Sequence, residues 1–173
     1  DEFVIVLPGL STAAAAAIIE GASFDNNLLC IGEKEVFVVA SKADAFFKAM
    51  REKGAVELDR RAVEKLTEAA FTFDGEGKGC GRAHVRKDLV GKDAAVLAAA
   101  AGVRVPEGTQ LLFGETKADH PFVQEEQMMP FLPIVRVPDF SAGVAAALQA
   151  EHGYRHTAIV HTRNVEHATA MAR

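Results

Sequence analysis

The chain has 173 residues, the length of one ordinary domain, and 49% of them are apolar, which is enough to form a buried core. The formal net charge of −5 argues against a general affinity for nucleic acids or for anionic membrane surfaces. No apolar stretch approaches the roughly 20 residues that a membrane-spanning helix needs. We therefore expect a globular protein with no nucleic-acid partner and no membrane partner.

Hydrophobic periodicity and turn residues predict strands and helices that alternate along the whole chain. The predicted strands cover residues 3–7, 35–40, 111–113, 132–137 and 157–161. The predicted helices cover residues 11–20, 41–53, 59–70, 93–101, 141–151 and 164 onward. This alternation is typical of an α/β fold with a mostly parallel, open sheet that is flanked by helices.

Capping and breaking residues set several of the predicted boundaries. Gly21 is expected to end the first helix, and Ser41 with Asp44 resembles a capping box for the second. Pro133 interrupts its strand, and a proline is better tolerated at the edge of a sheet or at the start of a strand. Residues 116–129 are expected to be polar and irregular.

The two ends of the sequence carry no boundary signals. The chain opens inside a predicted strand, and it closes within a helical pattern that no capping glycine or proline follows. We therefore expect residues 1–173 to be a fragment of a longer protein.

Cys30 is the first candidate for chemistry, because it lies in a predicted loop where a thiol is accessible. Asn26 and Asn27 can donate hydrogen bonds to an oxyanion, and Lys34 adds a nearby positive charge. A half-buried structural cysteine remains the alternative, since free cysteines are commonly buried. Cys80 lies in an unlike context, so we expect no disulfide and a reducing, cytoplasmic setting.

Two further patterns are weighed and set aside. The glycine cluster of residues 75–81 lacks the G-K-[ST] ending of a phosphate-binding loop, so a flexible loop is expected. His152 and His156 have the four-residue spacing of metal ligands on a helix, but Gly153 lies between them and no third ligand is near. We expect no metal.

Four blocks of sequence carry a resemblance to a known family. They read SFDNNLLCIGEKEVFVV around Cys30, then LVGKDA, HPFVQEEQMMPFLPIVRVPDF and EHGYRHTAIVHTRNVEH. Together they resemble the CoA-acylating aldehyde dehydrogenases of bacterial microcompartments, which use propionaldehyde or acetaldehyde. The resemblance implies the catalytic-domain fold of aldehyde dehydrogenases over residues 1–173, without most of the NAD-binding domain. It also implies residence inside a bacterial microcompartment and a homo-oligomeric full-length protein.

The resemblance also implies a mechanism and its residues. Cys30 is the catalytic nucleophile that forms a thioester from a short-chain aldehyde or an acyl-CoA, with NAD and coenzyme A as the cofactors. Asn27 belongs to the asparagine pair that precedes this cysteine in the family. Glu126 matches a glutamate that binds the nicotinamide ribose, while Met128 stands where the family has an aromatic residue. His156 is a candidate for steering coenzyme A, and satisfying a backbone carbonyl is its other possible role.

Three alternatives stay open at this point. The first is an isolated domain of the same fold that has no catalysis of its own. The second is a hydrolytic aldehyde dehydrogenase, since the glutamate that activates water in those enzymes would precede residue 1. The third is a generic cysteine hydrolase built on Cys30 and a histidine, although no histidine is placed by the sequence to act as its base.

Three basic residues are further candidates for binding a ligand. Lys34, Arg155 and Arg163 could contact coenzyme A phosphates.

Overall fold

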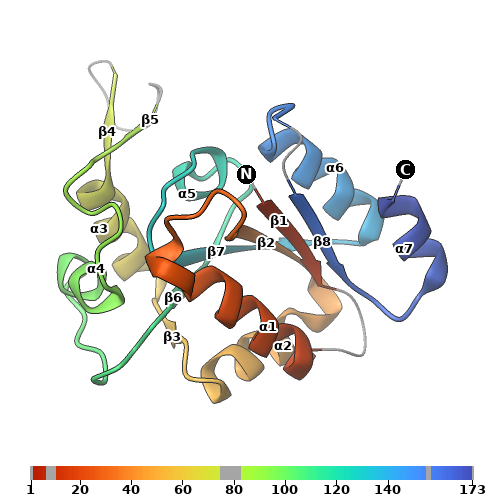
Figure 1. The fold of residues 1–173 in the computed structure, drawn as a ribbon, viewed down its shortest axis with the longest axis horizontal. Coiled ribbons are helices and arrows are strands. Elements are labelled where there is room, and N and C mark those ends of the chain that lie inside the picture. The colour runs from red at the N-terminus through yellow and green to blue at the C-terminus, as the bar shows by residue number, and fades with distance from the viewer. Residues whose placement is uncertain (1, 7–10, 75–82, 155–156, 173) are drawn as a thin grey trace.

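A computed structural model describes residues 2–6, 11–74, 83–154 and 157–172. The strands of its main sheet are β1 (Glu2–Val6), β2 (Glu33–Val39), β3 (Val56–Glu57), β6 (Leu112–Thr116), β7 (Phe131–Val137) and β8 (Thr157–His161). They form one six-stranded open sheet in the order β3-β6-β7-β2-β1-β8, and every neighbouring pair is parallel (Figure 1). The expected α/β fold with a parallel sheet is therefore confirmed.

Helices flank this sheet, and a short antiparallel ribbon stands apart from it (Figure 1). The helices are α1 (Ser11–Ser23), α2 (Ala40–Glu52), α3 (Arg60–Ala70), α4 (Ala94–Ala100), α5 (Pro121–Gln124), α6 (Phe140–Ala150) and α7 (Val165–Met171), with a 3₁₀ turn η1 (Phe24–Asn27). The ribbon pairs β4 (Phe71–Phe73) with β5 (Ala83–Val85). Within the described ranges, no helix is both long enough and apolar enough to cross a bilayer.

The central strand β2 shows how the core is divided. Successive side chains of a strand point to opposite faces of the sheet. Val36 and Val38 accordingly pack with α1 and α2, while Phe37 and Val39 pack with α6 on the other face. All seven residues of β2 are buried, as expected for a parallel strand that helices cover on both sides.

The prediction that Gly21 ends the first helix is wrong, because α1 continues to Ser23. The glycine instead allows the Glu33 side chain to approach the helix backbone closely. A Cβ atom at this position would lie only 2.0 Å from Oε2 of Glu33, so the Glu33 carboxylate occupies the space that a larger residue would fill. The helix tolerates the roughly 1 kcal/mol cost of an interior glycine, since this packing requires the missing side chain.

The predicted capping box at Ser41 is also wrong. The helix α2 begins at Ala40 without a side-chain cap. Asp44 instead accepts a hydrogen bond from the Arg136 guanidinium at 2.7 Å, and Arg136 also binds Glu115 at 2.9 Å. These partners come from β6 and β7, which lie far away in the sequence, so a local pattern could not reveal them.

Pro133 lies in the interior strand β7, between β6 and β2, and not at an edge of the sheet. The proline is tolerated because β2 pairs with β7 only from the register position Val36–Ile134 onward. Before that position the side chain of Gln127 links the two strands, since its amide donates to the carbonyls of Lys34 and Phe131 at 3.2 and 3.3 Å. A buried amide therefore replaces the ladder that a proline cannot form.

The segment predicted as irregular contains the short helix α5. His120 caps it, because Nδ1 of the imidazole accepts a hydrogen bond from the Phe122 N–H at 3.2 Å. Nε2 of the same ring lies 3.4 Å from the Thr67 hydroxyl. Burial lowers the pKa of His120 below its ordinary value, against a smaller raising effect of Asp119.

The capping histidine predicts a pH dependence of stability. A histidine whose pKa is lowered by folding binds fewer protons in the folded state than in the unfolded state. The contribution of His120 to the free energy of unfolding is therefore complete above the ordinary value of 6.5, and it is lost as the pH falls below that value toward the folded-state pKa. We expect His120→Asn, which keeps a capping acceptor but cannot titrate, to lose less free energy of unfolding than the natural protein between about pH 7.5 and pH 5.5. Urea titrations at both pH values measure this, and equal losses in the two proteins would contradict it.

Candidate active site around Cys30

Cys30 lies on the loop between η1 and β2, and its residue is exposed. The chain reaches this loop through three consecutive residues with positive φ: Asp25 at 47°, Asn26 at 53° and Asn27 at 63°. Asparagine and aspartate tolerate the left-handed region better than other non-glycine residues do. The D-N-N sequence therefore forms the tight turn that presents Cys30 to the solvent.

Asn27 holds the two ends of this loop together from inside the protein. Its amide nitrogen donates to the carbonyl of Ala22 at 2.8 Å and to that of Glu33 at 2.9 Å, and its side chain is buried. Both amide hydrogens are therefore occupied. The expected role of the Asn27 side chain as an oxyanion donor does not fit this geometry, which makes it a structural anchor.

Asn26 ties the loop to a second part of the chain. Its amide nitrogen donates to the carbonyl of Gly91 at 3.0 Å and to Oδ1 of Asp93 at 2.9 Å. Asp93 precedes the helix α4 and makes no side-chain capping bond there. Gly91 has a φ of +66°, and a Cβ atom on it would lie 3.0 Å from the Leu28 side chain. The glycine thus allows the Cys30 loop to pack closely against this segment.

The segment that contains Glu126 and Met128 joins the same assembly. The Gly91 N–H donates to the carbonyl of Met128 at 3.0 Å, and the buried amide of Gln127 binds the carbonyl of Lys34. Three sequence blocks that are far apart in the chain therefore meet at the amino ends of β2 and β7. The side chains of Glu126 and Met128 are both half-buried there.

The other residues that the sequence singled out are Glu126, Met128, His156 and Cys80. The Glu126 carboxylate makes no hydrogen bond or ion pair with the residues that the structure describes, and its residue is half-buried. Met128 has a φ of +49°, which is unusual for a non-glycine residue. His156 and Cys80 lie outside the described residues.

Lys34 was expected to contact coenzyme A phosphates, and this expectation is wrong because the residue is only 1% exposed. Its Nζ atom donates to the carbonyl of Asn27 at 2.7 Å, to Oδ1 of Asn27 at 2.5 Å and to the carbonyl of Leu29 at 2.9 Å. Neighbouring Glu33 is also buried, and burial raises the pKa of its carboxyl despite opposing effects of its own backbone N–H and of the Lys34 charge.

Sequence reasoning missed the structural roles of Lys34 and Gln127. A usable signal was present for Lys34, because Glu33, Lys34 and Glu35 form a run of charges at the start of an apolar strand. Strands of a parallel sheet are buried on both faces, so charges at such a position require partners. Gln127 carries no comparable signal in the sequence.

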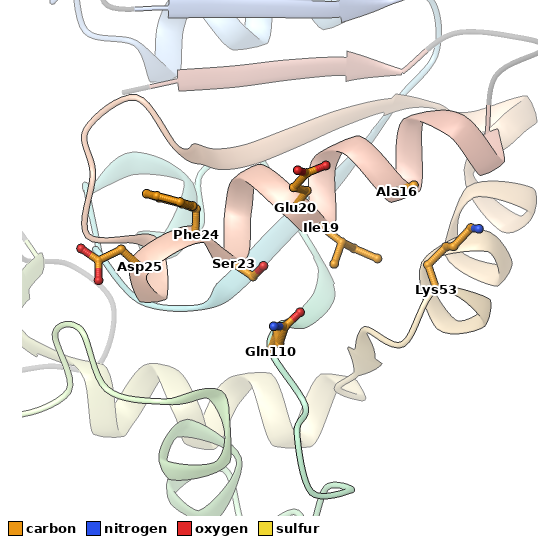
Figure 2. A pocket seen from close by; sticks show the side chains of 8 residues that line it. All are labelled: Ala16, Ile19, Glu20, Ser23, Phe24, Asp25, Lys53 and Gln110. Atoms are coloured by element: carbon orange, nitrogen blue, oxygen red, sulfur yellow. The ribbon is translucent and has the colours of Figure 1, made fainter.

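A pocket of about 480 Å³ lies along the outer side of α1 and reaches the turn before the Cys30 loop (Figure 2). Its lining consists of Ala16, Ile19, Glu20, Ser23, Phe24, Asp25, Lys53 and Gln110. These residues include neither a thiol nor an imidazole, and Cys30 is not among them. Phe24 and Asp25 connect it to the loop, and Phe24 is 63% exposed.

Comparisons with known proteins agree with the resemblance. The chain is 45% identical over 160 residues to the acetylating acetaldehyde dehydrogenase EutE of Salmonella typhimurium, which covers 92% of this chain and 33% of that protein. The structure of Rhodopseudomonas palustris propionaldehyde dehydrogenase with bound propionyl-CoA matches with a TM-score of 0.88 at 37% identity, over 99% of this chain and 36% of that one. A second structure of that enzyme holds CoA and an acylated cysteine.

A third relative adds a cellular context. A propionaldehyde dehydrogenase from the fucose utilisation bacterial microcompartment of Clostridium phytofermentans matches with a TM-score of 0.87 at 35% identity, over 99% of this chain and 38% of that one. No family model matches the chain.

The parallel sheet and these similarities show the catalytic-domain fold of the aldehyde dehydrogenases. The proteins that the chain is similar to include CoA-acylating aldehyde dehydrogenases, in agreement with the sequence resemblance. The chain spans about one third of the length of the curated relatives that it matches.

Proposed function

We propose that Cys30 is the acyl-accepting nucleophile of a CoA-acylating aldehyde dehydrogenase and that residues 1–173 are its catalytic part. The observation that carries this proposal is the combination of exposure and anchoring at one residue. Cys30 is exposed, while the loop that carries it is held by hydrogen bonds from the side chains of Asn27 and Lys34 to backbone carbonyls. An accessible thiol on a fixed loop is what a covalent catalyst requires.

The chemistry starts with attack of the Cys30 sulfur on the carbonyl carbon of a short-chain aldehyde, which forms a thiohemiacetal. Transfer of a hydride from that carbon to bound NAD⁺, together with release of the hydroxyl proton, would leave a thioester on Cys30. The thiol of coenzyme A then takes over the acyl group, and the Cys30 thiol is restored. In the reverse direction an acyl-CoA acylates Cys30 directly, without any redox step. The exposed apolar residues Leu29 and Ile31 beside Cys30 suit a short aliphatic chain.

Glu126 fits a role in holding the nicotinamide cofactor. Its carboxylate is half-buried, lies on a segment fixed by Gln127 and has no described protein partner, and a carboxylate can accept both hydroxyl groups of a ribose. NAD⁺ supplies the hydride acceptor when it is bound. Met128 follows at the same edge of the sheet, where its thioether can pack against an aromatic ring.

The relatives support further parts of the proposal. A bound propionyl-CoA and an acylated cysteine in the Rhodopseudomonas palustris enzyme support thioester chemistry with coenzyme A. The Clostridium phytofermentans neighbour supports residence in a bacterial microcompartment. Because the curated relatives are about three times as long as the chain, we propose that most of the NAD-binding domain lies outside these residues.

An acyl-transfer experiment tests the reaction class. When the protein is incubated with excess propionyl-CoA without NAD⁺, we expect a burst of free coenzyme A of about one equivalent per chain, because acylation of Cys30 stops once the thioester has formed. Chromatography of the released coenzyme A measures the burst. Continuous release without a burst limit would instead indicate a hydrolase, and no release would contradict the acylating function.

A further inference from the structure

Lys34 is a buried cation that the proposed chemistry does not use directly. All three hydrogen-bond donors of the ammonium group have an acceptor here: Oδ1 and the carbonyl of Asn27, and the carbonyl of Leu29. Burying an ammonium is costly unless it is paired and hydrogen-bonded. These three acceptors belong to Asn27 and Leu29, two residues of the loop that precedes Cys30, so the ammonium group is directed toward this loop and not toward the solvent.

The bond to Leu29 fixes the peptide group that joins Leu29 to Cys30. Its carbonyl oxygen accepts from Lys34 at 2.9 Å and from the Gly32 N–H at 3.0 Å, so two donors hold it on the inner side of the loop. The described chain contains no cis peptide bond. In a trans peptide the C=O and the N–H point in opposite directions, and the Cys30 N–H is therefore directed away from Lys34.

The neighbouring peptide group supports this interpretation. Lys34 holds the Asn27 carbonyl in the same way, and the opposite end of that group, the Leu28 N–H, is already bonded to the carbonyl of Asp25 at 3.1 Å. The Cys30 N–H, by contrast, has no acceptor among the hydrogen bonds of the described residues. One outward N–H is thus left available on the residue that carries the thiol.

We propose that Lys34 is a positioning residue that directs the Cys30 N–H toward the oxyanion formed during acyl transfer. This inference rests on the proposed function of Cys30. When the Cys30 sulfur attacks the thioester carbon of an acyl-CoA, a new S–C bond forms and an electron pair moves onto the carbonyl oxygen. The N–H donates to that oxygen until the intermediate collapses. The bond to the coenzyme A sulfur then breaks, and the departing thiolate takes up the proton that Cys30 released.

Two reactions of the same thiol separate this role from a general structural role. Acylation by propionyl-CoA passes through an oxyanion, whereas alkylation by iodoacetamide displaces iodide and forms none. In Lys34→Met we expect the rate of Cys30 acylation to fall about 10²- to 10³-fold, as for the loss of one oxyanion donor. We expect the alkylation rate to change less than about threefold, because no such donor is used. Mass spectrometry of the Cys30 peptide follows both rates, and thermal unfolding checks that the variant is folded.

The control Lys48→Met removes an exposed lysine from α2, at 71% side-chain exposure, and should change neither rate. If Lys34→Met does not fold, Lys34→Gln is expected to show the same selective loss of acylation, because its shorter, uncharged amide has only two N–H donors for the three acceptors of Lys34. Equal losses of acylation and alkylation, or no loss of acylation, would overturn the positioning role. Failure of the natural protein to become acylated would overturn the proposed function itself, so the two failures are distinguishable.

Discussion

Replacing Phe122 by alanine is expected to lower the free energy of unfolding by about 3–5 kcal/mol, the usual loss for a large aromatic residue in a core. Phe122 is fully buried, and its ring centroid lies 4.8 Å from that of Phe71 and 4.6 Å from that of Phe131. The three rings join the helix α5 to the main sheet and to the ribbon strand β4. Alanine would leave a cavity that its neighbours Phe71 and Phe131, which lie on two different strands, cannot easily fill.

Urea denaturation at constant pH measures this loss. Phe24→Ala is the matched control, because Phe24 is 63% exposed and its loss should change the free energy of unfolding by no more than about 0.5 kcal/mol. A loss below about 1 kcal/mol in Phe122→Ala would show that this aromatic cluster does not stabilise the fold as described.

The second large effect is expected at the nucleophile. Cys30→Ser should lower the rate of acyl transfer from propionyl-CoA roughly 10⁴-fold or more, as typically follows from removal of a catalytic nucleophile. Because Cys30 is exposed and Ser differs from it by one atom, we expect little change in the free energy of unfolding. The readout is the rate of coenzyme A release, measured alongside thermal unfolding.

Cys80→Ser provides the control for this variant, since Cys80 is the other cysteine of the chain. It should retain the full coenzyme A burst. Retention of the burst in Cys30→Ser would show that Cys30 is not the nucleophile, and loss of the burst in Cys80→Ser would show that Cys80 is required. Either result would contradict the proposal.

The fold class was predictable because the strands and helices alternate and their apolar runs have the right lengths. The order of the strands was not predictable, since it depends on backbone pairing between strands that are far apart in the sequence, such as β2 with β7 at Val36 and Ile134. Local patterns also misplaced the end of α1, where Gly21 makes room for Glu33, and the position of Pro133, where Gln127 supplies the missing strand contact. In each case a distant side chain outweighed a local preference.

The candidate site was predictable in its location but not in its construction. The loop position and the resemblance both indicated Cys30. The roles of its neighbours changed, because Asn27 and Lys34 proved to be buried anchors of the loop, where the sequence had indicated an oxyanion donor and a phosphate contact. A charged or amide side chain looks the same in a sequence whether it meets a ligand or a backbone carbonyl. Only the burial and the partners distinguish the two roles.

Peptide mapping by mass spectrometry after incubation with propionyl-CoA, without NAD⁺, tests the central claim most directly. Acyl transfer needs a nucleophilic thiol but no hydride acceptor, so the experiment isolates the function proposed for Cys30. The account predicts a propionyl group on the peptide that contains Cys30 and none on the peptide that contains Cys80. Equal labelling of the two cysteines, labelling of Cys80 alone or no labelling would contradict it.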